Sequence, residues 1–165
     1  VPKPLNNNQS ETLFALKLAC RDLVNATKDV KHLQKNVLKY HDHVNDDLAT
    51  QYRAFRFQLA DLLHNLQNIL NYPDSEEALL AFSAQQKKLL AADIVRNGQL
   101  DELIEAQKVP SETITSLLND SQYCLDIGHR LLQMAQALYW ARSGGNNASR
   151  DLILNNDELS ELDHG

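Results

Sequence analysis

Aspartate and histidine residues recur along the chain at a spacing that could hold a metal ion. The pattern Asp-x-x-His occurs three times, at Asp29 and His32, at Asp61 and His64, and at Asp126 and His129. Side chains three positions apart share one face of an α-helix, and helical bundles with two metal ions use carboxylate and imidazole ligands in this arrangement. A metal centre requires the three pairs to point into a common interior.

The apolar residues around these pairs argue against such a convergence. On a helical wheel with about 100° between residues, His32 points nearly opposite the apolar stripe of its segment, and Asp61 and His64 fall on the solvent side. Asp126 points almost directly away from the apolar arc, with His129 at its margin. We therefore interpret the pattern as solvated helix faces, and a metal centre is the alternative. His41, Asp42 and His43 form a further polar cluster, at a predicted helix end.

A smaller polar set lies nearer the predicted core. Asp22 and Asp29 flank the apolar stripe of their segment at about 80 to 100° from its centre, Asn36 extends that flank, and Asp120 lies within the apolar arc of the last segment beside Tyr123. An unpaired buried carboxylate is costly, so Asp120 must find donors or shift its pKa. We expect these five residues to fix the register of the helices. The alternative is a cation or partner site formed by Asp22, Asp29 and Asp120.

No other arrangement typical of catalysis occurs. The chain has no glycine-rich phosphate loop, no Gly-x-Ser-x-Gly motif and no Cys-x-x-Cys pair. Cys20 and Cys124 fall on apolar helical faces and are expected to be core residues in a reducing compartment. Phe57 points away from the main stripe of its segment, and we expect it to pack within the domain. The sequence predicts that the protein is not an enzyme and uses no cofactor.

Long segments of helical period position these residues. Pro73, Gly98, Pro110 and the pair at 144–145 separate the segments. We predict helices from Ser10 to Tyr40, from a cap at Asn45 or Asp46 to about 71, over 76–97 after the cap Ser75, over 99–108, and from Ser111 to about Ala141. The first has the apolar stripe Leu16, Ala19, Leu23, Ala26, Val30, Leu33, Val37 and Tyr40. The second has the cleanest stripe, which comprises Leu48, Tyr52, Phe55, Leu59, Leu62, Leu66 and Ile69.

Long helices joined by short loops predict an all-α fold, an antiparallel up-and-down bundle of four main helices and one short helix. We assign residues 1–9 to a linker, 10–142 to the bundle and 143–165 to a polar tail with a turn of helix around DLIL. Gly128 lies in the middle of the last helix on its apolar face, which indicates close approach of a neighbouring helix.

The net charge and the apolar content of the chain limit the classes of binding partner that we expect. The chain of 165 residues carries a formal net charge of -6, which argues against attraction to nucleic acid or to an anionic membrane surface. No apolar run approaches the roughly 20 residues that span a bilayer, so we expect no direct membrane insertion. The opening VPKPLNNN has no signal-peptide pattern and is more typical of an interdomain linker, so we expect the chain to be a fragment.

Two stretches resemble a known family. LVNATKDVKHLQKN, from Leu23 to Asn36, and TSLLNDSQY, from Thr115 to Tyr123, are similar to two phrases of the PhoU-like domain at the cytoplasmic C-terminus of bacterial sodium/phosphate cotransporters. The resemblance spans about 10–142. It implies a non-catalytic regulatory or interaction domain, attached to the membrane-embedded transporter part of the same polypeptide on the cytoplasmic side of the bacterial inner membrane.

Related PhoU proteins can carry metal clusters on Glu/Asp-x-x-x-Asp motifs, and this chain departs from that pattern. The fourth residues after Asp22, Asp29 and Asp120 are Ala26, Leu33 and Cys124. Metal binding is therefore not carried over from the family. A stand-alone metal-carboxylate bundle is the alternative function. An apolar strip on the segment 76–97 is a candidate contact surface for a homodimer.

Overall fold

The computed structural model describes residues 3–142, which form five α-helices and contain no β-strand. The helices are α1 (Asn7–Tyr40), α2 (Asp46–Asn71), α3 (Glu76–Ala91), α4 (Gln99–Glu105) and α5 (Ser111–Arg142). The predicted all-α class is confirmed. The predicted tail over 143–165, with its turn around DLIL, lies outside the described residues. No helix among residues 3–142 combines the length and the apolar character that crossing a membrane requires.

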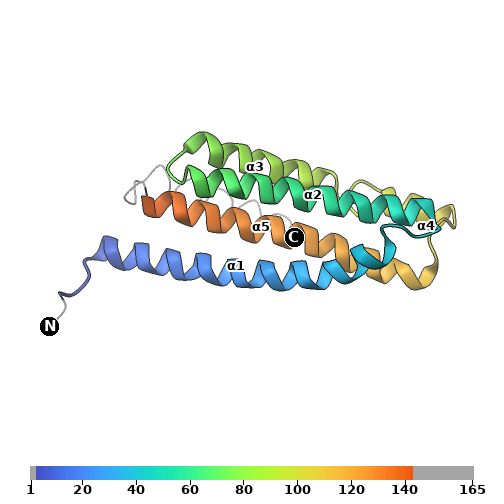
Figure 1. Ribbon diagram of the computed structural model, residues 1–165, viewed down its shortest axis with the longest axis horizontal. Helices are drawn as coiled ribbons and strands as arrows, with labels where there is room; N and C mark the ends of the chain where they lie inside the picture. Colours follow the sequence, from blue (N-terminus) through green and yellow to red (C-terminus); the bar gives the residue numbers. More distant parts are fainter. Residues whose placement is uncertain (1–2, 143–165) are drawn as a thin grey trace.

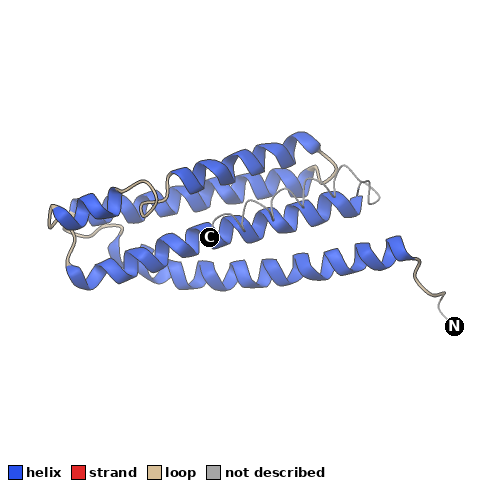
Figure 2. Ribbon diagram, turned by 180° about the vertical axis from the view of Figure 1, so that it is seen from behind, coloured by secondary structure: helices blue, strands red, loops and turns tan. Residues whose placement is uncertain are grey.

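The long helices lie side by side with α5 between α1 and the pair α2 and α3 (Figure 1). Successive long helices run back and forth along the longest axis of the molecule, and the short α4 lies at one end. Seen from behind, α1 forms the outer edge of the molecule, on the side of α5 opposite α3 (Figure 2). Because three helices surround α5, α5 contributes more buried residues than any other helix among residues 3–142.

Side-chain caps set where three helices begin. Ser75 caps α3 as predicted, and of the two predicted candidates Asn45 and Asp46 it is Asn45 that caps α2. Their side chains accept hydrogen bonds from the backbone N–H groups of Ala78 and Leu48. The first helix begins at Asn7 and not at the predicted Ser10. The reason is a capping box, in which the Asn6 side chain accepts from the Gln9 backbone at 2.7 Å and the Gln9 side chain accepts from the Asn6 backbone at 3.1 Å.

The third helix ends at Ala91, whereas the sequence predicted a helix to residue 97. The Asp93 carboxylate accepts a hydrogen bond from the Arg96 backbone N–H at 3.3 Å, which closes a turn in place of further helix. Gly98 then adopts a φ of 81°, a left-handed conformation that favours glycine, and α4 starts after it.

The apolar stripe of α2 is confirmed, whereas that of α1 needs a correction. Five of the seven α2 stripe residues are buried, and Leu59 and Leu66 are partly buried against the core. On α1, Leu23 and Val30 are 44% and 38% exposed. The buried apolar residues of α1 are instead Ala19, Ala26, Leu33 and Tyr40, which are seven positions apart. The buried face of α1 is therefore rotated away from the centre that the sequence pattern suggested.

Two further expectations about burial are wrong. Cys20 is exposed on α1 while Cys124 is buried. Phe57 is 71% exposed on α2 and does not pack within the domain. In each case the sequence pattern gave the residue's position on its helix but did not show that this face is left uncovered by the neighbouring helices.

Side chains of a neighbouring helix pack closely against Gly128, as predicted. A Cβ atom at this position would lie 2.9 Å from Cδ2 of Leu89 and closer still to the side-chain oxygen of Gln86, both on α3. Ordinary carbon contacts are longer, so a side chain at this position would require the Gln86 and Leu89 side chains to shift.

Candidate functional site

A row of buried and partly buried polar residues lies between α1 and α5. Asp22, Asp29 and Asn36 are seven positions apart on α1 and alternate with the buried apolar residues at spacings of three and four. Both sets therefore face α5, as the two core positions of a heptad do in a coiled coil. We call this contact the polar seam and define it by Asp22, Asp29, Asn36, Asp120, Tyr123 and Arg130.

Asp120 is the buried centre of the seam. It is 1% exposed, and its Oδ2 accepts hydrogen bonds from Nδ2 of Asn36 at 2.8 Å and from the hydroxyl of Tyr52 at 2.5 Å. The two donors come from α1 and α2, so one carboxylate links three helices. Burial raises the pKa of Asp120, although the hydrogen bonds from Tyr52 and Asn36 act to lower it. The predicted cross-bundle role of Asp120 in fixing register is consistent with these contacts.

The two aspartates of α1 are near a cationic residue of α5. Oδ2 of Asp29 lies 3.3 Å from Nε of Arg130, an ion pair whose alignment falls short of a hydrogen bond. Asp22 is 9% exposed and lies in the field of Arg21, Arg130 and His129. Burial raises the pKa of both carboxyl groups, and the arginines oppose that rise. Both aspartates therefore lie in the helix contact and not, as the wheel suggested, beside it.

Tyr123 completes the seam through a contact with His32. The two rings stack with their centroids 5.4 Å apart and their planes within 10° of parallel. His32 is exposed, as predicted, but it lies at the margin of the α1–α5 contact and not opposite the core as the wheel placed it. Asp126, predicted to point outward, is only partly exposed, and its charge raises the pKa of Asp29, because α1 covers that side of α5.

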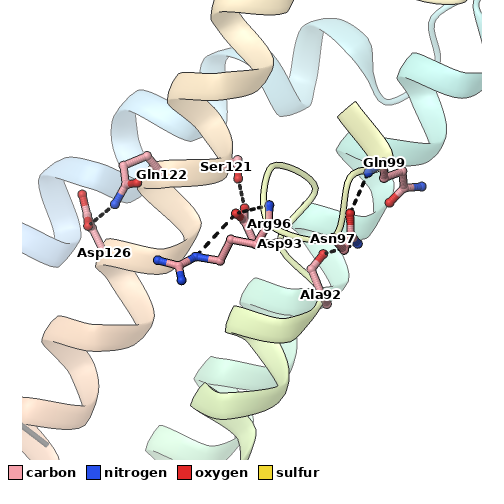
Figure 3. A network of polar contacts seen from close by, with 8 residues as sticks. All are labelled: Ala92, Asp93, Arg96, Asn97, Gln99, Ser121, Gln122 and Asp126. Carbon is pink, nitrogen blue, oxygen red and sulfur yellow. Dashed lines mark hydrogen bonds and ion pairs between the residues drawn. The ribbon is translucent and has the colours of Figure 1, made fainter. Parts of the chain in front are cut away.

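A second polar network joins the turn after α3 to α5, and the sequence did not reveal it (Figure 3). Asp93 is 7% exposed and accepts a hydrogen bond from the Ser121 hydroxyl, while its Oδ2 lies 3.9 Å from Nε of Arg96. Elsewhere on α5, Gln122 donates to Asp126 at 2.9 Å. The signal was weak because Asp93 was assigned to the interior of a longer helix, where an aspartate would be unremarkable.

A small cavity of about 10 Å³ adjoins this network. Its lining includes Phe55, Leu89, Asp93, Ser121 and Cys124. A volume of this size has room for about one water molecule and is too small for an organic substrate. Burial raises the pKa of the Cys124 thiol, so this cysteine is a poor nucleophile at neutral pH.

The three Asp-x-x-His pairs lie on three different helices. The pairs of α1 and α5 are close enough for the charge of Asp126 to act on Asp29, whereas the α2 pair lies apart from them. Asp61 and His64 are exposed on α2, as the wheel predicted, and His32 is also exposed although its ring stacks on Tyr123. Within residues 3–142, no three side chains of His, Cys, Asp or Glu are grouped closely enough to hold a metal ion. His41 and His43 lie in the α1–α2 connection, where Nε2 of His41 pairs with Oδ2 of Asp42 at 3.0 Å.

The chemistry available to the seam is structural. Its carboxylates accept hydrogen bonds or pair with arginine, and its most buried member is closed to solvent. Directional contacts of this kind favour one register between packed helices. Comparison of the chain with protein-family models, curated proteins and solved structures gives no match.

Proposed function

We propose that the chain is a non-catalytic regulatory domain of a sodium-dependent phosphate transporter, and that it acts by contact with the membrane-embedded part of that transporter. The observation that carries the proposal is the meeting of the two sequence stretches that resemble the PhoU-like domain. Asn36 of the first stretch donates to Asp120 of the second, and His32 of the first stacks on Tyr123 of the second. Residues shared with the family phrases thus hold one helix pair together.

The site supports a contact role and not a reaction. Asp120 is closed to solvent, and the neighbouring cavity holds about one water molecule. Packed helices can move together as a unit when an interface changes. The α1–α5 pair could in this way transmit a conformational change to the transporter. Under this proposal, the domain changes the rate of transport and does not itself bind and convert phosphate.

The test is phosphate uptake by the complete polypeptide that contains this chain, reconstituted into lipid vesicles under an inward sodium gradient. We expect deletion of residues 1–165 to change the uptake rate severalfold, and we expect Asp120→Ala to reproduce part of that change because it loosens the seam. Asp61→Ala, an exposed substitution on α2, serves as the control and should leave uptake unchanged.

Two results would overturn the proposal. One is sodium-dependent phosphate uptake that is the same with and without residues 1–165. The other is a complete reading frame that encodes no membrane-spanning segments, since the domain would then have no transporter to regulate.

A further inference from the structure

The outward side of α1 differs in charge from the rest of the chain. The helix carries six of the 16 lysine and arginine side chains but only three of the 22 carboxylates. Two of the three, Asp22 and Asp29, face α5 in the polar seam, and the third is Glu11 in the first turns. The overall charge of -6 therefore conceals a positive face.

Five cations lie on the side of α1 that points away from α5. They are exposed and recur along 19 residues of helix, at Lys17, Arg21, Lys28, Lys31 and Lys35. Large apolar side chains lie between and beyond them on the same side. Leu13, Phe14, Val24 and Leu38 are 43%, 63%, 54% and 64% exposed. We call these nine residues the outer strip of α1.

The outer strip contains no acidic residue. Arg21 acts on the neighbouring Asp22, but the other four cations have no carboxylate beside them on the strip, because Asp22 and Asp29 face α5. At physiological salt, charges more than about 8 Å apart are largely screened. An approaching surface therefore experiences the positive strip and not the net negative charge of the whole chain. The sequence-based exclusion of an anionic surface, which rested on net charge, does not apply to this face.

The shape of the strip indicates the kind of partner. From Leu13 to Leu38 the helix is about 40 Å long at about 1.5 Å per residue, and α1 forms an outer edge of the bundle (Figures 1 and 2). A single helix at an edge is a convex ridge. Peptide helices usually bind in grooves, whereas a ridge of cations and apolar side chains can lie along a flat bilayer, with the cations at lipid phosphates and the apolar groups among the upper chain carbons.

We propose that the outer strip of α1 binds the surface of a bilayer that contains anionic phospholipid. The strip lies on the interface and does not cross it. This inference rests on the charge and shape of α1 alone, and it holds whether or not the chain regulates a transporter.

The test is co-sedimentation of the purified chain with vesicles of phosphatidylglycerol and phosphatidylcholine, beside vesicles of phosphatidylcholine alone. We expect binding to the anionic vesicles to be at least about tenfold tighter and to weaken as salt is added. The triple variant Lys17→Gln, Lys28→Gln, Lys31→Gln should lose at least about tenfold of that binding. Val24→Ser should weaken it by a smaller factor, since it removes one inserting side chain.

The matched control removes the same charge elsewhere. Lys87, Lys88 and Lys108 are exposed and lie outside α1, so their replacement by Gln should leave vesicle binding near that of the parent chain. Equal loss in the two triple variants would overturn the proposal, because the effect would then follow net charge and not the strip. Absence of vesicle binding, or binding only to an acidic leucine-rich helical peptide, would also overturn it, the latter in favour of a protein partner.

Failure here is distinguishable from failure of the proposed function. Vesicle binding uses the isolated chain and no transporter, whereas the uptake experiment uses the complete polypeptide and reads a transport rate.

Discussion

The two sides of α5 show two ways of holding a helix. Towards α1, small or apolar residues alternate with polar ones. Three side chains of α1 contact a specific side chain of α5: Asn36 contacts Asp120, Asp29 contacts Arg130 and His32 contacts Tyr123. Towards α3, the contact depends on closeness, because Gly128 has no side chain and Leu89 fills the space. Polar pairs specify which residues meet, and close packing specifies how near the helices come. The first contact should therefore respond to charge, pH and salt, and the second to volume.

The largest loss of stability is expected from a substitution at the centre of the α1–α5 contact. Asp120→Ala leaves the Tyr52 hydroxyl and the Asn36 amide without an acceptor in a site that is 1% exposed, and we expect a loss of about 3 kcal/mol in the free energy of unfolding. Urea unfolding followed by circular dichroism measures it. Asp61→Ala on the exposed side of α2 should change stability by less than about 0.5 kcal/mol. Equal effects of the two substitutions would contradict a central role for Asp120.

The next effect tests the packed side. Gly128→Leu places a side chain where even a Cβ atom would be 2.9 Å from Leu89, and we expect it to cost about 2 kcal/mol. Gly128→Ala should cost less, because the crowded atoms are at the ends of side chains and alanine favours the helix by about 1 kcal/mol. Thermal unfolding of both variants, with the exposed substitution Ala60→Leu as control, measures the difference. A Gly128→Leu variant as stable as the parent would show that the two helices separate readily.

The stability that the polar seam contributes should also depend on pH. Burial raises the pKa of Asp120, Asp22 and Asp29, so the folded chain holds protons more tightly at these sites than the unfolded chain. Their contribution to stability is complete below the unfolded aspartate pKa of about 3.9 and is lost as pH rises through the raised folded values. Asp120→Asn should flatten that decline in a series of urea titrations. An unchanged slope would mean that Asp120 does not titrate across this range.

The smallest expected effect concerns the ion pair at the edge of the seam. The Asp29 and Arg130 side chains are 16% and 33% exposed, so their attraction is partly screened. A double-mutant cycle with Asp29→Asn and Arg130→Gln should give a coupling of about 0.5 to 1 kcal/mol that falls at high salt. A coupling that is independent of salt would indicate packing and not charge.

Much of the helical framework could be predicted from the sequence. The caps Asn45 and Ser75 and the stripe of α2 were correct because they depend on residues only three or four positions apart. The start of α1 was missed because asparagine followed by glutamine three positions later also makes a capping box. The end of α3 was missed because Asp93 ends the helix through a turn and a contact with α5 that is distant in sequence.

The seam residues could be nominated, but their partners could not. Asp120 was placed in the core correctly, and Tyr52 was assigned to an apolar stripe although its hydroxyl supplies one of the two hydrogen bonds to that carboxylate. A helical wheel gives angles about one axis and holds no information about which neighbour covers each angle. For that reason Cys20 and Phe57 were expected inside and are exposed.

The sequence by itself determined that this chain is helical, where most of its helices begin, and which polar residues lie near its core, because local spacing controls hydrogen bonding within a helix and the faces that it presents. Only the tertiary structure decided that α1 turns Asp22 and Asp29 towards α5 and leaves its lysines outside. The physical reason is that burial depends on the direction from which a neighbouring helix approaches, and that direction is set by the packing of the whole bundle.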